Sequence, residues 1–570
     1  MLARLRSAMR SPLAWVLAGV LTLFLVGLGW GLPASDPWDN DGVAPRDFLV
    51  AVAQTFDKDG FDFAYLHLAP VHLVLLALLT LPISLTALSS AGGTSPDAVI
   101  HAFIQTRYMT PIAWVARAVS VAMALGAVLA LAKVGEELRG RRAGALVAAA
   151  CGTNMALVYY AHTTNLEVPY LFWGSWALLS LVRAIARREP RRLRAFAVLG
   201  ALAIGSKDQA AGLFLLGAPL SLVSWVLTDA WAREHRRQVA KEAVTALGIA
   251  IAVFLVADEI VLNPTGFAAR VRFLLGPASQ DWIAYSGSLH GRLTLLWDIG
   301  AHTLLSYPVP IGLLAVAGVV GVLRGPNDAR AAALAPLACA ISFTACVNLT
   351  TYRTEERFLL PQTLVLGLYA GLALDRLLAI PSAKRTLWAA RAVAAVVLCW
   401  AALSAANVDA VLLFDPRYDA EAWMGEHVTP SDSLEIYGLN VYLPRLPEHA
   451  RVERVDPGPV EGRSPLPGVV ERQDAWDDLA GRRPKWISVS NAWAWCFLED
   501  PPTHVPDGRT IPRARVLGVD DVTCGYFRSL LAGERGYRVA HISAWSSLLW
   551  PDVHIHSSTG DIVWTLERVD

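Results

Sequence analysis

The chain has 570 residues, of which 54% are hydrophobic and only 17% are charged, and its mean hydropathy is +0.42. This composition excludes an ordinary soluble domain and is typical of a polytopic membrane protein. A formal net charge of zero argues against a nucleic-acid partner. The six cysteines show no CxxC spacing, so the sequence contains no zinc-binding or redox motif.

Three arginines and the amino terminus give the first ten residues four positive charges, and an apolar run follows at residues 12–32. A run of about 20 residues is long enough to cross a bilayer, so we expect an uncleaved anchor. Basic segments recur between the later apolar runs and mark the inner face by the positive-inside rule. They lie at residues 139–142, 187–194, 233–241, 324–330 and 384–385.

Two basic loops on one face must be joined by an even number of crossings. Three apolar runs precede residue 139, at 12–32, 68–88 and 112–134, so one of them does not cross. We predict that 68–88, which contains Pro82 and lacks basic flanks, is a helix lying along the outer surface. The same parity requires a hairpin with its tip at residues 205–208, and its short half-helices must be buried in protein or line a wet cavity.

The complete count gives about eleven spans. They are predicted at residues 12–32, 112–134, 143–161, 168–186, 195–206, 209–228, 244–262, 308–323, 331–350, 361–380 and 387–406. An odd number places the carboxyl end outside, together with the loops 33–111 and 263–307. The expected fold class is a polytopic α-helical membrane protein with a C-terminal extracytoplasmic mixed α/β domain.

The composition changes after residue 406, where Pro, Asp, Arg and Trp become more frequent. We therefore divide the chain into a transmembrane domain, 1–406, and a soluble domain, 407–570. Strands are predicted at 434–443, 485–490, 537–542 and 562–566, and a helix at 418–427. Cys496 and Cys524 either pair in an oxidising compartment or stay as two thiols.

An acidic segment follows the first apolar run directly, at residues 35–42 with the sequence Ser-Asp-Pro-Trp-Asp-Asn-Asp-Gly. Placing an ionised side chain at the middle of a bilayer costs roughly 2.5 to 3.5 kcal/mol, so clustered acids at a membrane boundary indicate a function. The alternative is that the segment is an ordinary solvated loop. Asp36 and Asp39 suit turn or capping positions better than catalysis. The next outer turn, residues 159–169, brings His162 and Glu167 to the same face.

This arrangement resembles the GT-C glycosyltransferases, membrane enzymes that take a sugar from a polyprenyl-phosphate carrier, and within them the protein O-mannosyltransferase and lipid A aminoarabinose transferase branch. That branch has an acidic pair after its first span; Asp41 is the best match to its aspartate, and Gly42 stands where its glutamate follows. Arg117 resembles the arginine that opens its second span. Glu167 replaces its usual aspartate before a proline.

Three further motifs carry the resemblance, which covers about residues 10–406. Residues 205–208, Gly-Ser-Lys-Asp, resemble a Thr-Lys-Gly type turn, and residues 352–361 resemble an Arg-Tyr-Leu-Leu-Pro type entry to a late span. Residues 65–72 loosely match a Pro-containing motif. Ala69 stands where the aminoarabinose transferases have a lysine, so that phosphate contact cannot be carried over.

The chemistry of the resemblance suits these residue types. Expulsion of an anionic phosphate needs cations more than a general acid, and the candidates are Lys207, Arg353 and Arg357. The acceptor hydroxyl needs a carboxylate to accept its proton, and Asp41 is the chosen residue. Glu167 shares the acceptor, binds a divalent cation with Asp41, or holds the first loop in place.

Arg117, His162 and Asp39 complete the predicted substrate-binding set. Several candidates have structural alternatives. Glu167 could cap the following helix, Lys207 could pair with Asp208, and His162 could bond locally. Arg353 and Arg357 could be interfacial anchors, which is a common use of arginine at the end of a span.

The sequence therefore predicts an inverting membrane glycosyltransferase, a hexosyl or pentosyl transferase that acts at the outer (periplasmic) face in protein glycosylation or glycolipid modification of the cell envelope. Its donor is a polyprenyl-phosphate sugar, and its acceptor is a lipid, a glycan or a protein. The other expected partners are the lipids of a bacterial inner (plasma) membrane. The sequence indicates no certain cofactor and leaves a requirement for a divalent cation open. The alternatives are a transporter or flippase of a lipid-linked saccharide, which internal repeats would favour, and a receptor-like module.

Overall fold

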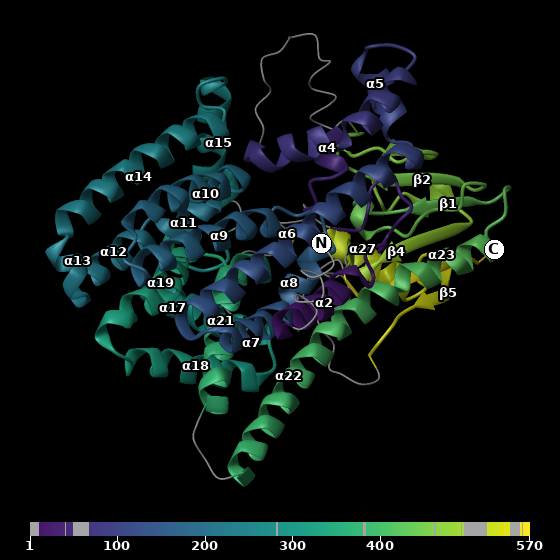
Figure 1. The fold of residues 1–570 in the computed structure, drawn as a ribbon. Helices are drawn as coiled ribbons and strands as arrows, with labels where there is room; N and C mark the ends of the chain where they lie inside the picture. Colours follow the sequence, from purple (N-terminus) through teal and green to yellow (C-terminus); the bar gives the residue numbers. More distant parts are fainter. Residues whose placement is uncertain are drawn as a thin grey trace, which may run out of the picture. The chain divides into compact units, whose positions relative to one another are not determined.

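The protein is described from a computed structural model (Figure 1). The described residues are 11–39, 41–49, 68–280, 283–379, 384–460, 463–491, 493–494, 521–547, 559–560 and 562–569. The basic first ten residues, residues 65–67 of the predicted motif at 65–72, and Cys496 lie outside them, so the pairing of Cys496 with Cys524 stays a prediction.

Helices form most of the described chain (Figure 1). They are α2 (Pro12–Leu25), α4 (Pro70–Ser89), α5 (Pro96–Phe103), α6 (Thr106–Arg139), α7 (Arg141–Gly152), α8 (Met155–Ala161), α9 (Glu167–Ala186), α10 (Leu193–Ser206), α11 (Ala211–Phe214), α12 (Gly217–Thr228), α13 (Ala230–Glu234), α14 (Arg236–Ala257), α15 (Pro264–Leu275), α16 (Pro277–Gln280), α17 (Leu289–Leu305), α18 (Val309–Leu323), α19 (Asn327–Phe343), α20 (Leu349–Thr351), α21 (Leu360–Ala379), α22 (Lys384–Leu413), α23 (Pro416–His427), α24 (Leu479–Arg482) and α27 (Asp521–Leu531). Short 3-10 turns include η2 (Asp208–Ala210), η4 (Glu356–Leu359) and η5 (Asn440–Tyr442).

The chain forms two compact units. The first, called the helical unit, comprises Met1–Leu28, Asp62–Leu78 and Arg117–Val408; the second, called the sheet unit, comprises Gly29–Phe61, Leu79–Ala116 and Asp409–Asp570. This division differs from the predicted one at residue 406, because most of the first loop groups with the C-terminal residues. In addition, α22 continues past the predicted boundary to Leu413.

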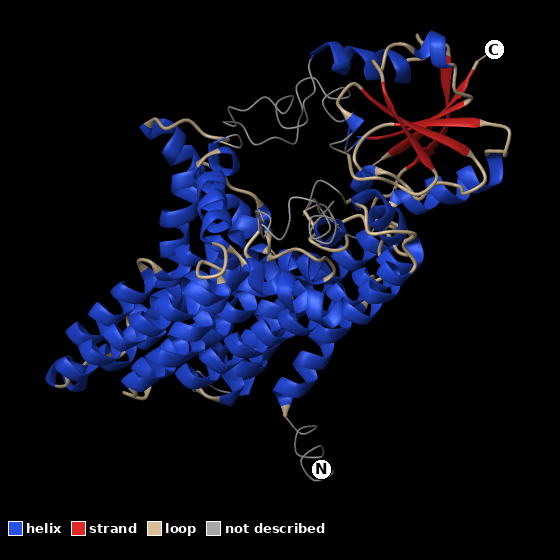
Figure 2. Ribbon diagram, turned by 90° about the horizontal axis from the view of Figure 1, so that it is seen from above, coloured by secondary structure: helices blue, strands red, loops and turns tan. Residues whose placement is uncertain are grey.

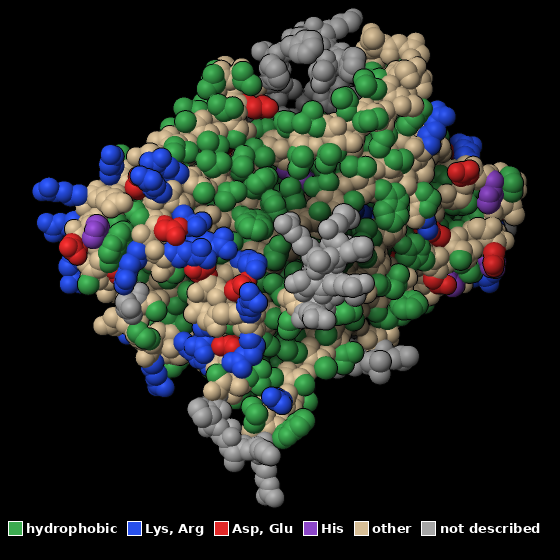
Figure 3. All heavy atoms as spheres, in the orientation of Figure 1, with side chains coloured by type: hydrophobic (Ala, Val, Ile, Leu, Met, Phe, Trp, Pro, Cys, Tyr) green, Lys and Arg blue, Asp and Glu red, His purple; other side chains and the backbone are tan. Residues whose placement is uncertain are grey.

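The fold is that of a multi-pass membrane protein, as predicted. Among the described residues, 8 helices are long and apolar enough to cross a membrane, or up to 10 if each of two bent pairs is one span, close to the predicted count of about eleven. Large apolar side chains are exposed along α12, α14, α18 and α22, as surfaces in contact with lipid require. Figure 3 shows hydrophobic side chains over much of one face and Lys and Arg side chains gathered around α13 and toward α18.

The structure adds two details to the predicted spans. The span predicted at 143–161 is broken into α7 and α8, bent by 71°, because the side chain of Asn154 accepts a hydrogen bond from the Leu157 N–H at 2.8 Å and starts a new helix. The outer loop predicted at 263–307 contains α15, α16 and α17. Asn263 and Ser288 cap α15 and α17 with their side chains.

The predicted break at 205–208 is present. Helix α10 ends at Ser206, Lys207 is extended with φ −158°, and η2 begins at Asp208 before α11 and α12. Helix α4 matches the run at 68–88. It is itself long and apolar enough to cross a membrane, so its placement along the outer surface stays a prediction.

The sheet unit contains a six-stranded sheet in the order β3-β2-β1-β4-β6-β5 (Figure 2). Strands β1 (Ser433–Ile436), β2 (Arg451–Asp456), β3 (Val469–Gln473) and β4 (Trp486–Ser490) are parallel; β6 (Val563–Arg568) is antiparallel to β4 and to β5 (Tyr537–Ser543). The helix predicted at 418–427 and the last three predicted strands are confirmed. The first strand is shorter than predicted, because Gly438 with φ +104° turns the chain.

Both faces of this sheet are covered by apolar side chains. Side chains of β4 and β6 pack with Leu479 of α24 and Phe527 of α27 in one cluster. Others from β1 and β2 pack with Ala420 and Met424 of α23 in a second cluster. Strands β2 and β3, which sequence patterning missed, lie on the side of β1 away from β4, and β3 is largely exposed.

Candidate active site

All three predicted phosphate-binding cations lie near one aromatic ring in the helical unit. The ring belongs to Phe358 in η4, at the entrance to α21. The Nζ atom of Lys207 lies 5.5 Å from the ring centroid, and the Cζ atoms of Arg353 and Arg357 lie 4.6 and 4.8 Å from it. We call Lys207, Arg353 and Arg357 the cation cluster. Residues from two distant parts of the chain thus meet at one point.

Glu167 holds the lysine of this cluster. The Nζ atom of Lys207 donates to Oε1 of Glu167, with side chains 17% and 4% exposed respectively. Glu167 is the first residue of α9 and its carboxylate faces the lysine, so the capping alternative is not realised. Asp208 also lies within electrostatic range of Lys207, and its Oδ1 atom lies 3.5 Å from the Nε atom of Arg270.

Arg353 and Arg357 share a second carboxylate. One NH2 group of Arg353 donates to Oε1 of Glu355 at 2.5 Å, and the Nε atom of Arg357 lies 2.9 Å from its Oε2. Arg353 is buried, which is unlike an interfacial anchor. Tyr352, just before it, has φ 49°, and its carbonyl accepts from the Ala284 N–H at 2.9 Å, which fixes the turn.

A buried tyrosine, Tyr160, lies near this site. It is fully enclosed and lies within electrostatic range of Glu167, Arg357 and Glu356. Sequence reasoning did not assign a role to Tyr160, Glu355 or Phe358. The run Tyr159-Tyr160 before His162 and the spacing of acids between the two arginines were the available signals.

The acidic segment, residues 35–42, belongs to the sheet unit. Asp39 is buried, and its carbonyl accepts from the Gly42 N–H at 3.0 Å, which closes a turn as predicted for it. Asp41 is exposed and has φ 60°, a left-handed conformation that few non-glycine residues adopt. The turn therefore presents the Asp41 carboxylate at the surface of its unit.

The acids of this segment share one cation. Arg46 interacts electrostatically with four carboxylates, those of Asp36, Asp39, Asp41 and Asp47. A single guanidinium among several carboxylates keeps the segment acidic as a whole while lowering the repulsion within it.

Asp36 is the most perturbed of these acids. Burial raises the pKa of its carboxyl to about 7, although Arg46 and a hydrogen bond from Asn440 act in the opposite direction. The Nδ2 atom of Asn440 donates to Asp36 Oδ2 at 3.1 Å. Sequence reasoning treated Asp36 as a turn residue, because its partner lies more than 400 positions away in the chain.

Arg117 and His162 hold the chain where it leaves α2. Arg117 is fully buried within α6, and its NH1 group donates to the carbonyl of Leu28 at 2.8 Å. The ring nitrogens of His162 lie 2.7 Å from the carbonyl oxygen of Val158 and 2.6 Å from that of Val26. These contacts are the local bonding expected for His162, and contact of either residue with substrate stays a prediction.

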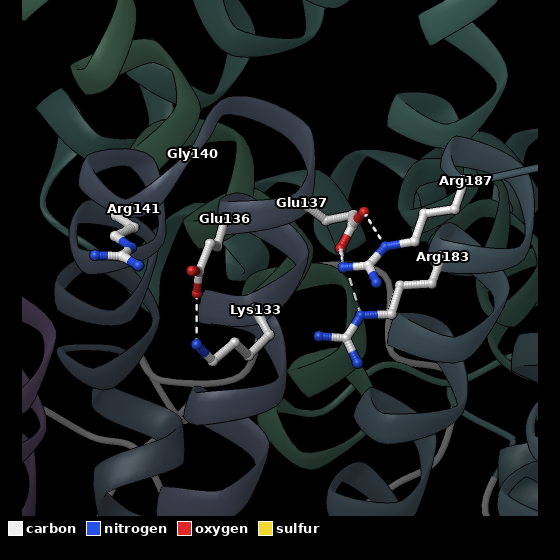
Figure 4. A pocket seen from close by; sticks show the side chains of 7 residues that line it. All are labelled: Lys133, Glu136, Glu137, Gly140, Arg141, Arg183 and Arg187. Atoms are coloured by element: carbon white, nitrogen blue, oxygen red, sulfur yellow. Dashed lines mark hydrogen bonds and ion pairs between the residues drawn. The ribbon is translucent and has the colours of Figure 1, made fainter. Parts of the chain in front are cut away.

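A cavity of about 350 Å³ lies between the ends of α6 and α9, and it contains none of the predicted site residues (Figure 4). Its lining is polar and comprises Lys133, Glu136, Glu137, Gly140, Arg141, Arg183 and Arg187. Ion pairs Lys133–Glu136 and Arg187–Glu137 cross its wall. Within the described part of the chain, no group of three His, Cys, Asp or Glu side chains is arranged to hold a metal ion.

Residues 101–260 match the family model described as dolichyl-phosphate-mannose-protein mannosyltransferase. This segment contains Arg117, His162, Glu167 and Lys207. The predicted resemblance to GT-C glycosyltransferases is confirmed over it.

Two solved structures are similar to this chain at low sequence identity. The ArnT protein from Cupriavidus metallidurans bound to undecaprenyl phosphate is 18% identical, with a TM-score of 0.43, over 84% of this chain and 92% of that chain. The oligosaccharyltransferase AglB from Archaeoglobus fulgidus, in complex with an inhibitory peptide and a dolichol-phosphate, is 13% identical, with a TM-score of 0.44, over 94% of this chain and 80% of that chain. No curated protein sequence matches this chain.

Proposed function

We propose that the protein is an integral membrane glycosyltransferase that transfers a sugar from a polyprenyl-phosphate donor to an acceptor hydroxyl at the outer face of the membrane. The observation that carries this proposal is the cation cluster, in which Lys207, Arg353 and Arg357 meet at the ring of Phe358. The family match over residues 101–260, a segment that includes Lys207, supports the same class of reaction.

The cation cluster suits a departing lipid phosphate. The guanidinium group of an arginine can donate to two phosphate oxygens at once, and the ammonium group of a lysine adds a compact positive charge. Glu167 and Glu355 hold these cations in position before any ligand arrives, so little reorganisation is needed as negative charge develops on the leaving group. Because Lys207 already engages the Glu167 carboxylate, we assign Glu167 to orienting that lysine.

The acidic segment suits the acceptor. In the proposed step, the acceptor oxygen forms a bond to the anomeric carbon, and the bond from that carbon to the phosphate oxygen breaks with its electron pair. The proton of the acceptor hydroxyl passes to the exposed carboxylate of Asp41. One displacement of this kind inverts the anomeric carbon. The product is a glycosylated lipid, glycan or protein and a free polyprenyl phosphate.

Transfer of radiolabelled sugar tests the proposal. Membranes carrying the wild type, Asp41→Asn or Asp477→Asn at equal expression are supplied with a panel of polyprenyl-phosphate sugars. Asp477 is an exposed acid of the same unit and serves as the matched control. Loss of transfer in Asp41→Asn alone supports the assigned base. Equal transfer in all three proteins removes Asp41 from the mechanism, and movement of the labelled lipid across the bilayer without transfer favours the transporter.

A further inference from the structure

The backbone next to the acidic segment is clamped by the C-terminal part of the sheet unit. The Gly31 N–H donates to the hydroxyl of Tyr418 at 2.9 Å, and the NH1 group of Arg445 donates to the carbonyl of Leu32 at 2.9 Å. Arg445 is itself held by Glu421, to which its Nε atom donates at 2.8 Å. The segment that leads into the acids is thus fixed on α23 and the turn that follows β1.

Buried rings and a buried guanidinium complete this clamp. The Cζ atom of Arg417 lies 4.1 Å from the Trp38 ring and 5.4 Å from the Trp30 ring. Arg417 is paired with Asp415, which also accepts from the Trp30 indole N–H at 2.9 Å. Position 31 must be glycine, because φ is +68° and a Cβ atom would lie 2.9 Å from the Trp38 ring.

A side-chain relay reaches the acids themselves. The NH1 group of Arg454 donates to Oδ1 of Asn440 at 2.5 Å, and Nδ2 of Asn440 donates to Asp36 at 3.1 Å. Arginine has donors and no acceptor, so it must face the amide oxygen, and the amide NH2 must then face Asp36. Arg454 is fixed in turn by Glu471, to which its Nε atom donates at 2.9 Å. Asn440 and Arg454 are both buried.

The relay lies at a distinctive place in the sheet. The chain passes from β1 to β2 and β3 on one side and then returns to β4 on the other side of β1. Open α/β sheets bind ligands at the carboxyl ends of the strands at such a reversal. Asn440 follows β1 at this end, and Arg454 pairs in register with Ile436, the last residue of β1. In this sheet, the carboxyl end of β1 is followed by Asn440, which holds Asp36 of the acidic segment of the same chain.

We propose that the C-terminal domain positions the acidic segment, with Asn440, oriented by Arg454, as the positioning residue that holds Asp36. This inference rests on the proposed function for its consequence in transfer. The charged groups that face Asp36, besides the amide of Asn440, are Arg46, Asp39 and Asp47.

Hydrogen–deuterium exchange of the full-length protein measures the positioning directly. Asn440→Asp keeps an acceptor for Arg454 but sets a second carboxylate against Asp36. The reporters are the amide of Gly31 and that of Ala34, which donates to Oγ1 of Thr110 at 3.0 Å. At pH 8 we expect both amides to exchange about tenfold faster than in the wild type, because a hydrogen bond to a charged group is lost. At pH 6 the two carboxylates share a proton, and the difference should shrink.

Two further variants make this test decisive. In the double variant Asp36→Asn with Asn440→Asp, the amide at position 36 donates to the carboxylate at position 440, and exchange at pH 8 should return to within about threefold of the wild type. Asn491→Asp, at the end of β4, is the matched control and should change nothing. Equal exchange in Asn440→Asp and Asn491→Asp, or failure of the double variant to restore protection, would overturn the inference.

Transfer kinetics give the functional readout. At pH 8, Asn440→Asp should lower kcat about tenfold and leave KM for the donor unchanged, and the double variant should restore kcat. A wild type without transfer defeats the proposed function, while the exchange data still decide the positioning. A transferring wild type whose kcat survives in Asn440→Asp defeats the positioning inference and leaves the proposed function standing.

Discussion

Replacing Lys207 by methionine separates the two tasks assigned to this lysine, which are pairing with Glu167 and binding phosphate. The Glu167 side chain is 4% exposed, so Lys207→Met leaves a carboxylate buried without its partner. Breaking a buried ion pair in this way costs about 3–5 kcal/mol. Because the lysine is 17% exposed, we expect the lower end, about 3 kcal/mol of unfolding free energy.

The double variant Lys207→Met with Glu167→Gln removes both charges and should recover most of that stability. It should not recover transfer. Loss of one preorganised charge next to a developing anion typically costs about 10²–10³ in kcat, and both variants lack the same ammonium group. Glu167→Gln alone keeps the lysine, and we expect it to retain transfer within about tenfold of the wild type.

Thermal unfolding in detergent and transfer of radiolabelled sugar, measured on the same preparations, check this prediction. Recovery of both stability and transfer in the double variant would refute the reasoning, because Lys207 would then serve only to neutralise Glu167. A loss in Glu167→Gln as deep as that in Asp41→Asn would instead give Glu167 the catalytic role.

Three other outcomes are expected. Phe358→Leu should raise KM for the donor about tenfold, because each cation loses about 0.5–1 kcal/mol of contact with the ring; an unchanged KM would show that the ring does not organise the site. Burial raises the pKa of Asp36 from 3.8 to about 7, so the ionised carboxylate costs stability increasingly as pH rises through this interval. Asp36→Asn should therefore raise the unfolding temperature at pH 8 and not below about pH 4, and a difference independent of pH would contradict the assignment. Gly31→Ala should loosen the acidic segment, since left-handed backbone costs about 1–2 kcal/mol outside glycine, and unaltered amide exchange would argue against the clamp.

Much of the candidate site could be predicted because its charged residues stand inside or beside long apolar runs, where charges are uncommon. Lys207 interrupts a long apolar tract, and Arg353 and Arg357 stand at the entrance to another. Hydrophobic runs reveal spans because bilayer thickness sets their length, and charges beside such runs are rare enough to indicate function. The roles of Arg117 and His162 were harder to see, since both contact backbone carbonyls that no pattern specifies.

The sequence by itself determined that this is a multi-pass membrane protein, where its long apolar runs lie, and which charges stand at their ends, because these follow from local hydropathy. The tertiary structure alone decided that Lys207 pairs with Glu167, that three cations meet at Phe358, and that Asn440 holds Asp36. Such contacts depend on side-chain packing and on the orientation of individual donors and acceptors. Residues far apart in the chain acquire these only when the helices and the sheet have formed.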